Sequence, residues 1–237
     1  MASECGGRRR AVVLLSGGLD SLIAAHLAAP DYDLQLAITC DYGQRAAVAE
    51  LAAAGHQAAR LNIPRQQVNL RWLGRMASNA LTDLSKPMPH AGKDSPNSPD
   101  HPACTSCHAA QLWVPNRNAV LLMVAAAYAE ALECEAIVAG FNREEAALFS
   151  DNSPEFVAAV NQLLQHSTRQ HPSVISPTLH MTKTDMLQLA QRDHVMLDCI
   201  YSCYEAGPRH CWQCESCARL KRALLEANCW ESVGPHI

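Results

Sequence analysis

The 237-residue chain has a formal net charge of −4 and is 49% hydrophobic, which suits one α/β domain with an appendage. The acidic balance argues against a general nucleic-acid or membrane-binding surface. The sequence has no apolar run of about 18 residues and no signal-peptide pattern, so we expect a cytoplasmic protein with no membrane partner. Eleven cysteines in a reducing compartment then indicate metal binding or catalysis, not a disulfide framework.

Strand-like and helix-like segments alternate along most of the chain. Short apolar runs predict strands at residues 11–15, 34–43, 66–73, 135–141 and 173–179. Longer segments predict helices at residues 22–29, 45–60, 119–133, 153–167, 182–191 and 218–227. The second of these helices is alanine-rich with Glu50 on its polar face, and the fourth begins with an N-cap at Ser153 followed by Pro154. The alternation predicts an α/β fold with a doubly wound parallel sheet and helices on both faces.

Residues 85–110 interrupt this alternation and are predicted to form a proline-rich insertion or lid, because they hold five of the thirteen prolines and no apolar period. Cys104 and Cys107 lie within it, in HPACTSCH. The C-x-x-C-H spacing matches haem attachment, but that reaction needs an exported chain. Three interpretations stay open: two thiols on a loop, a redox pair, or a second metal site that uses His101 or His108.

The hexapeptide SGGLDS, residues 16–21, lies between the first predicted strand and the first predicted helix. A glycine turn in this position presents backbone N–H groups and a helix dipole to a phosphate. The segment has no lysine, so it is not the Walker-type loop. It resembles the SGG-x-DS loop of PP-loop ATP pyrophosphatases, which cleave ATP to AMP and pyrophosphate.

Polar motifs follow other predicted strands or begin predicted helices, where doubly wound folds build their sites. DYGQR begins at Asp41 after the second strand, and GFN ends the fourth. VPNRN places Arg117 and Asn118 at the start of a helix, although Arg117 could equally form a surface ion pair. Lys183 begins another helix, where a cation opposes the helix dipole unless an anion is bound. It is therefore either a phosphate ligand or a plain solvated lysine.

Cys203, Cys211, Cys214 and Cys217 form the pattern C-x7-C-x2-C-x2-C near the C-terminus. Two-residue gaps allow neighbouring thiolates to bind one tetrahedral ion, and an all-cysteine set is typical of structural zinc. An iron–sulfur cluster is the weaker alternative, because nothing else in the sequence indicates redox chemistry. Cys199 and Cys229 flank the set and are expected to be spare buried thiols.

Taken in order, SGGLDS, DYGQR, ALTD, VPNRN, SPEF, TK-x-D, SCY and C-x2-C-x2-C resemble the 7-cyano-7-deazaguanine synthase family over about residues 12–225. The resemblance implies an adenine nucleotide alpha hydrolase-like domain at residues 1–198 and a zinc knuckle with a helix at 199–237. It also implies queuosine or related deazapurine biosynthesis, in which ATP activates 7-carboxy-7-deazaguanine and ammonia captures the acyl adenylate. The resulting amide is activated again and dehydrated to the nitrile.

The resemblance also assigns residues and partners. It implies that ATP is bound by Leu15, Ser16, Gly17, Gly18, Leu19, Asp20 and Ser21. Catalytic roles fall to Asp20, Arg117 and Lys183, and magnesium would share the phosphate charge. Substrate contacts fall to Tyr42, Gln44, Arg45, Asn118, Asn142, Glu144 and Glu145. Structural zinc and a homodimer are implied as well.

One segment departs from the family pattern. Family members carry a segment similar to D-SGYPDCRPEF after the fourth strand, whereas this chain has GFNREEAALFSDNSPEF, in which the SGYPDC core is missing. Glu144, Glu145 and Asp151 lie nearby, and a carboxylate could accept hydrogen bonds from a guanine-like edge. Glu144 and Glu145 could equally be solvated. The alternatives are therefore a PP-loop ligase that stops at the amide or uses another amine, a tRNA sulfur-transfer enzyme with Cys104 and Cys107 as sulfur carriers, and a zinc-knuckle interaction module without catalysis.

Overall fold

The computed structural model describes residues 7–90 and 110–237, which contain one parallel sheet with the strand order β3-β2-β1-β4-β5. The strands are β1 (Arg9–Leu14), β2 (Tyr32–Asp41), β3 (Arg65–Asn69), β4 (Ala136–Val138) and β5 (Ser173–Ile175). All neighbouring strands pair in parallel, with β1 at the centre between β2 and β4. The predicted parallel sheet is confirmed, and its order reverses at β1, where such folds place their ligands.

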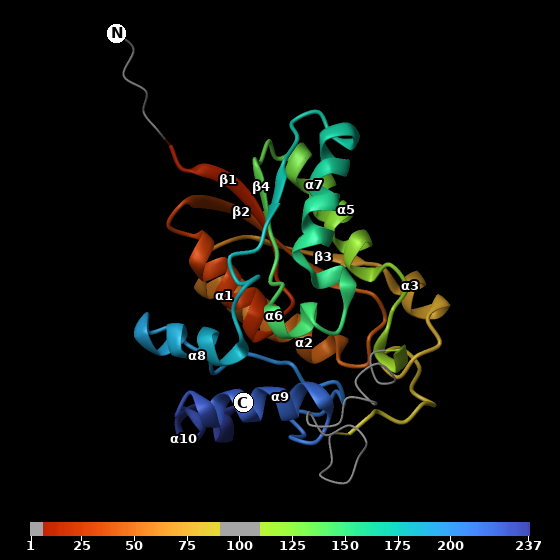
Figure 1. Cartoon of the computed structure of the whole chain (residues 1–237), viewed down its shortest axis with the longest axis vertical. Helices are drawn as coiled ribbons and strands as arrows, with labels where there is room; N and C mark the ends of the chain where they lie inside the picture. The colour runs from red at the N-terminus through yellow and green to blue at the C-terminus, as the bar shows by residue number, and fades with distance from the viewer. Residues whose placement is uncertain (1–6, 91–109) are drawn as a thin grey trace.

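Helices cover both faces of the sheet (Figure 1). Alternate residues of β1 point to opposite sides, so Ala11 and Val13 pack with α1 (Leu19–Ala28) and α2 (Ala47–Arg60). Val12 packs on the other face with α5 (Arg117–Ala131) and α7 (Pro154–Ser167). The prediction of helices on both faces is confirmed. Ser153 caps α7 by accepting a hydrogen bond from the backbone N–H of Phe156 at 3.1 Å.

Three predicted strands, at 66–73, 135–141 and 173–179, are shorter than expected in the structure, where they form β3, β4 and β5. The strand expected at 66–73 ends at Asn69 and is followed by α3 (Arg71–Met76), because its neighbour β2 ends at Asp41. The backbone N–H of Leu70 donates to the carbonyl of Asp41 at 2.7 Å and completes the ladder there. Beyond β4, the chain forms two short elements that were not predicted, α6 (Arg143–Ala146) and a 3-10 turn (Ser150–Asn152).

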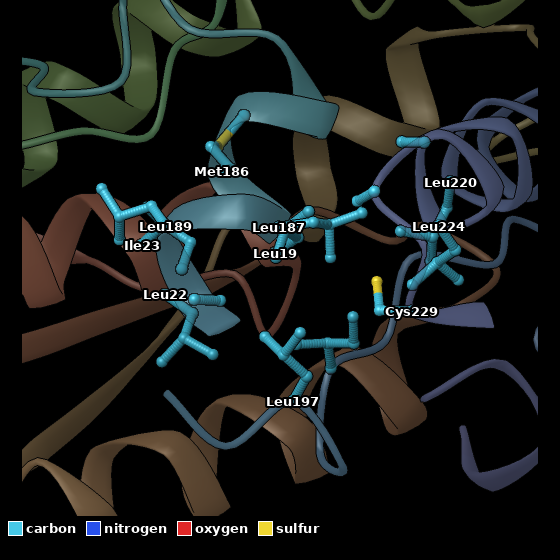
Figure 2. Packing of buried hydrophobic residues seen from close by; sticks show 14 of the residues in the cluster. Leu19, Leu22, Ile23, Met186, Leu187, Leu189, Leu197, Leu220, Leu224 and Cys229 are labelled. Atoms are coloured by element: carbon cyan, nitrogen blue, oxygen red, sulfur yellow. The ribbon is translucent and has the colours of Figure 1, made fainter. Parts of the chain in front are cut away.

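The C-terminal helices share a hydrophobic core with the start of the sheet domain (Figure 2). These helices are α8 (Lys183–Arg192), α9 (Glu215–Glu226) and α10 (Trp230–Val233), followed by a 3-10 turn (Gly234–His236). The cluster that joins them to α1 contains Leu19, Leu22, Ile23, Met186, Leu187, Leu197, Leu220 and Leu224. The domain boundary between residues 198 and 199 stays a prediction, although this core is continuous across it.

Most of the proline-rich insertion, with Cys104 and Cys107, lies outside the described residues. Within the described parts of the chain, no helix has the length and hydropathy needed to cross a membrane.

Two adjacent leucines of α9 provide a test of this packing. Leu224 is fully buried in the cluster, whereas 53% of Leu225 is exposed. We expect Leu224→Ala to lower the free energy of unfolding by about 2–5 kcal/mol, because a buried leucine loses its contacts and leaves a cavity. Leu225→Ala is the matched control and should change it by less than about 0.5 kcal/mol. Urea denaturation of both metal-loaded variants measures the difference, and equal effects would contradict the packing described.

Candidate active site

The SGGLDS segment forms a tight turn between β1 and α1 that only glycine can make. Gly17 has φ +88°, and a Cβ built on it would lie 2.5 Å from the backbone oxygen of Glu50 in α2. The carbonyl of Gly17 accepts hydrogen bonds from Gln57 Nε2 at 2.8 Å and from the backbone N–H of Tyr201 at 2.9 Å. Hydrogen bonds from α2 and from the segment that leads to the cysteine cluster therefore fix the position of the turn.

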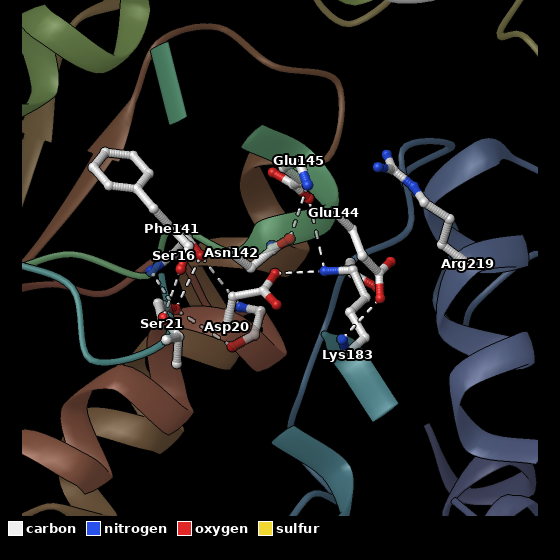
Figure 3. Close-up of polar contacts among 12 residues, drawn as sticks. Ser16, Asp20, Ser21, Phe141, Asn142, Glu144, Glu145, Lys183 and Arg219 are labelled. Carbon is white, nitrogen blue, oxygen red and sulfur yellow. Dashed lines mark hydrogen bonds and ion pairs between the residues drawn. The ribbon is translucent and has the colours of Figure 1, made fainter. Parts of the chain in front are cut away.

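The first helix begins without a side-chain cap. Gly18 occupies the N-cap position and has extended dihedral angles, so no side chain accepts from the first N–H groups of α1. Ser16 and Ser21 lie together, with their Oγ atoms 3.0 Å apart (Figure 3). Uncapped N–H groups, two hydroxyls and the positive end of the helix dipole are the features that bind a phosphate.

A cavity of about 240 Å³ opens over this turn, at the carboxyl ends of β1, β2 and β4. Among the predicted ATP-loop residues, its lining includes Leu15, Ser16, Gly18, Asp20 and Ser21. Among the predicted catalytic and substrate residues, it includes Arg117, Lys183, Tyr42, Gln44, Asn118 and Glu145. The fold therefore gathers motifs that lie up to 167 positions apart, from Ser16 to Lys183, around one space.

Lys183 reaches into this cavity and contacts two carboxylates. Its Nζ donates to Asp20 Oδ2 at 2.6 Å and lies 3.7 Å from Glu145 Oε1, with only 7% of the side chain exposed. Burial by itself lowers the pKa of Lys183, but the charges of Asp20 and Glu145 outweigh burial and raise it above its usual value. Lys183 is therefore a buried, charged ammonium group and not a solvated surface lysine.

Asp20 uses only one of its two carboxylate oxygens among residues 7–90 and 110–237. There, its Oδ1 is buried and accepts no hydrogen bond, whereas Oδ2 accepts from Lys183. A buried carboxylate oxygen next to a phosphate-binding turn is the kind of hard ligand that magnesium prefers. The residues present therefore fit a magnesium ion bound together with nucleotide phosphates.

Arg117 lies at the first position of α5 and stacks against the DYGQR motif. Its Nη1 donates to the Tyr42 hydroxyl at 3.3 Å, and its guanidinium carbon lies 5.5 Å from the centre of the Tyr42 ring. Asn118 Oδ1 accepts from Arg117 Nε at 3.3 Å, and Asn118 Nδ2 donates to the carbonyl of Asp151 at 3.1 Å. Arg117 therefore adds a second cation, besides Lys183, to the wall of the cavity.

Five predicted site residues lie outside the cavity lining: Gly17, Leu19, Arg45, Asn142 and Glu144. Arg45 donates to the carbonyls of Asp83 and Lys86 at 2.9 and 2.7 Å and pairs with Glu205 at 3.5 Å. Asn142 caps α6 by accepting from the backbone N–H of Glu145, and Glu144 accepts from the backbone N–H of Lys183. Their observed contacts hold the walls of the site in place.

The cavity also contains residues that the sequence analysis did not assign to a site: Thr39, Glu50, Tyr201, Ser202, Tyr204 and Ser216. Glu50 was expected on the polar face of its helix, but it lies at the cavity instead. Ser202, Tyr204 and Ser216 each lie beside a cysteine of the cluster, and Ser202 and Tyr204 also belong to the SCY motif; these two signals could have indicated them. Their place in the cavity depends on how the cysteine-containing segment folds back onto the sheet.

The four predicted metal ligands come together at the start of α9. The sulfur atoms of Cys203, Cys211, Cys214 and Cys217 all lie within 4.8 Å of one another. Backbone N–H groups of Cys211 and Cys214 donate to neighbouring sulfurs at 3.4 and 3.2 Å, which favours thiolates. This donor set fits a tetrahedral ion such as zinc, with no position left open. Cys229 is a buried thiol outside the cluster, whereas Cys199 is half-buried and lies 3.2 Å from Arg60 Nη1, so its predicted burial is wrong.

Comparison with known proteins agrees with this geometry. The sequence model of the family described as "Queuosine biosynthesis protein QueC" matches residues 10–228 of this chain. The chain belongs to the QueC family. A 7-cyano-7-deazaguanine synthase from Desulforudis audaxviator is 45% identical over 92% of this chain and 97% of that protein. Another from Pelotomaculum thermopropionicum is 42% identical over 92% of this chain and 97% of that protein.

The solved structures add only a distant likeness. A 4-thiouridine synthetase–RNA complex with bound ATP is 16% identical, covers 93% of this chain and 50% of that chain, and superposes with a TM-score of 0.49. A likeness at this level supports no functional statement about this QueC family member.

Replacing one cluster cysteine tests the metal centre. We expect Cys214→Ser to lose the bound metal, because three thiolates and a hydroxyl bind zinc far less tightly than four thiolates. Cys229→Ser changes a buried thiol outside the cluster and should keep the metal. Elemental analysis of the purified proteins gives the metal per chain and its identity. Equal metal content in both variants would contradict the assignment, and iron with sulfide in place of zinc would correct the choice of metal.

Proposed function

We propose that this protein uses ATP to convert 7-carboxy-7-deazaguanine and ammonia into 7-cyano-7-deazaguanine. The relatives named 7-cyano-7-deazaguanine synthase support the product. The observation that carries the proposal is the single cavity in which the phosphate-binding turn meets Asp20, Lys183 and Arg117. A carboxylate is a poor electrophile, so amide formation needs a leaving group such as AMP. A site built around a phosphate turn and two cations suits the transfer of AMP to such an acid.

In the first step, the substrate carboxylate attacks the α-phosphorus of ATP, the bond to pyrophosphate breaks, and an acyl adenylate forms. The N–H groups at the start of α1 and the hydroxyls of Ser16 and Ser21 hold the pyrophosphate end. Lys183 and Arg117 stabilise the negative charge that develops between the phosphates. No protein nucleophile is needed, because positioning and charge stabilisation carry the step.

Two metals are part of the proposal. Asp20 Oδ1 would hold magnesium, which when bound neutralises phosphate charge. Zinc at the four cysteines would hold the segment that carries Ser202, Tyr204 and Ser216 against the cavity, and it would supply no chemistry itself.

In the later steps, ammonia attacks the acyl carbon, and AMP and a proton leave, which gives the amide. The amide oxygen then attacks the α-phosphorus of a second ATP and pyrophosphate leaves. Loss of AMP and of both amide protons gives the nitrile. Four of the predicted substrate contacts line the cavity: Tyr42, Gln44, Asn118 and Glu145. Of these, Asn118 and Glu145 are proposed to accept from the N–H edge of the deazaguanine ring. A homodimer and the absence of a nucleic-acid partner stay predictions.

One incubation tests the proposal against its alternatives. Purified protein with magnesium, ATP, ammonia and 7-carboxy-7-deazaguanine should release pyrophosphate and AMP and form the nitrile, as followed by phosphate assay and mass spectrometry. Amide as the final product would indicate the ligase that stops one step earlier. Release of pyrophosphate with tRNA and a sulfur donor, but not with the acid, would favour sulfur transfer. No pyrophosphate under any of these conditions would contradict an enzymatic role.

A substitution of Lys183 tests whether its ammonium group stabilises the negative charge on the phosphates. We expect Lys183→Gln to lower kcat for pyrophosphate release by about 100- to 1,000-fold, because a buried cation aimed at the phosphates is lost. Lys221→Gln removes an exposed lysine that rests over Trp230, away from the cavity, and should leave kcat unchanged. Circular dichroism and metal content confirm that both variants fold. A folded Lys183→Gln protein with full activity would rule out this role for the ammonium group.

A further inference from the structure

Glu50 enters the active-site cavity beside the phosphate-binding turn. Its backbone oxygen is the atom that a Cβ on Gly17 would strike at 2.5 Å, so α2 and the turn touch at this residue. The Glu50 side chain belongs to the cavity lining together with Ser16, Gly18 and Tyr42. Glu50 therefore lines the cavity next to the turn, close to where the acyl adenylate forms in the proposed function.

Gln44 holds the Glu50 carboxyl group in place. Gln44 Nε2 donates to Glu50 Oε2 at 2.8 Å and to the carbonyl of Cys40 at 3.3 Å. Gln44 Oε1 accepts from the backbone N–H of Tyr42 at 2.9 Å. The amide is thus fixed on both sides by the end of β2 and the DYGQR turn. These bonds make Gln44 a positioning residue for Glu50, and its substrate contact stays a prediction because Gln44 also lines the cavity.

Glu50 differs from the other carboxylates of the cavity in its partners. The lining contains Asp20, Glu50 and Glu145, and Lys183 lies within 4 Å of both Asp20 and Glu145. Within residues 7–90 and 110–237, Glu50 makes no ion pair, and its hydrogen-bond partner is the neutral amide of Gln44. Burial raises the pKa of Glu50, while the hydrogen bond from Gln44 and the charge of Arg117 oppose this. A carboxylate with a raised pKa and no cation in contact is a stronger base than an ordinary glutamate carboxylate.

We propose that Glu50 is the general base that removes the proton from the amine nucleophile. The inference rests on the proposed function and adds a residue to it. As the nitrogen of ammonia attacks the acyl carbon, the N–C bond forms and the C–O bond to AMP breaks, so the electron pair leaves with AMP. The excess proton on nitrogen passes to the Glu50 carboxylate, which releases it to water before the amide is adenylated. The same group takes the N–H proton when the adenylated amide collapses to the nitrile.

Glu50 could instead accept hydrogen bonds from the N–H edge of the deazaguanine ring. The ring carries its carboxylate as a substituent, and that carboxylate must reach the α-phosphorus. A residue beside the turn therefore meets the reacting end of the substrate before it meets the far edge of the ring. This position favours proton transfer over ring recognition. Loss of proton transfer would slow amide formation, whereas loss of ring recognition would raise the KM for the acid.

The test separates adenylation from amine capture. Acid-dependent exchange of labelled pyrophosphate into ATP measures the first step alone, and amide formation measures both. We expect Glu50→Gln to exchange pyrophosphate within about threefold of wild type and to form amide from ammonia about 100-fold more slowly, the lower range for loss of a general base. Hydroxylamine is largely unprotonated at neutral pH and needs little base assistance, so it should capture the adenylate in the variant at a near wild-type rate.

Two further variants complete the experiment. Glu155→Gln removes an exposed glutamate of α7 and should leave both reactions unchanged. Glu50→Asp keeps a carboxylate but shortens its reach; it should fold if Glu50→Gln does not, and it should show an intermediate loss with ammonia. Circular dichroism and metal content report folding in each case.

Several outcomes would overturn the inference. Normal amide formation from ammonia in Glu50→Gln would remove Glu50 from proton transfer. A raised KM for the acid with normal kcat would assign Glu50 to ring recognition. Equal losses with ammonia and hydroxylamine, or loss of exchange itself, would indicate a structural or ATP-binding role. Failure of the wild-type chain to exchange pyrophosphate with the acid would instead contradict the proposed function, and the inference would fall with it.

Discussion

The buried contact between Lys183 and Asp20 is the interaction on which the site depends. An ammonium group with 7% of its surface exposed is stable as a cation only if carboxylates are held against it, and Asp20 Oδ2 lies at 2.6 Å. The contact joins the start of α8 to the start of α1, which are 163 residues apart in the chain. Each helix is also held at its first turn, α8 by a capping box of Thr182 and Asp185 and α1 by the glycine turn.

The same contact links the catalytic cavity to the cysteine cluster. α8 packs on α9 through Leu187, Leu220 and Leu224, and α9 begins at the cluster. Ser202, Tyr204 and Ser216 lie between or beside the cysteines and line the cavity. A metal at the cluster would therefore have two effects: it would stabilise the C-terminal segment, and it would fix one wall of the site at the correct distance from the turn.

The charges of the cavity are arranged in two groups with different partners. Lys183 forms ion pairs with Asp20 and Glu145, whereas Arg117 stacks on Tyr42 of the DYGQR motif. Glu50 lies with the neutral amide of Gln44. Carboxyl groups in one cavity thus have different environments, and different environments give them different proton affinities. In the proposed function, this separation would allow one site to bind phosphates with some groups and move protons with another.

Local patterns in the sequence determined the alternation of strands and helices, the phosphate turn and the metal ligands. Each depends on residues that are close in the chain: apolar periods, two adjacent glycines, and cysteines at two-residue gaps. The same patterns could not give the end of β3, because that strand stops where its neighbour β2 stops. They also could not separate Arg45 and Glu144, which brace the walls, from Gln44 and Glu145, which line the cavity. Nor could these sequence patterns show that Glu50, on the polar face of a helix, lines the cavity. Only the tertiary structure decided these placements, because they depend on which backbone segments pack against α2 and the turn.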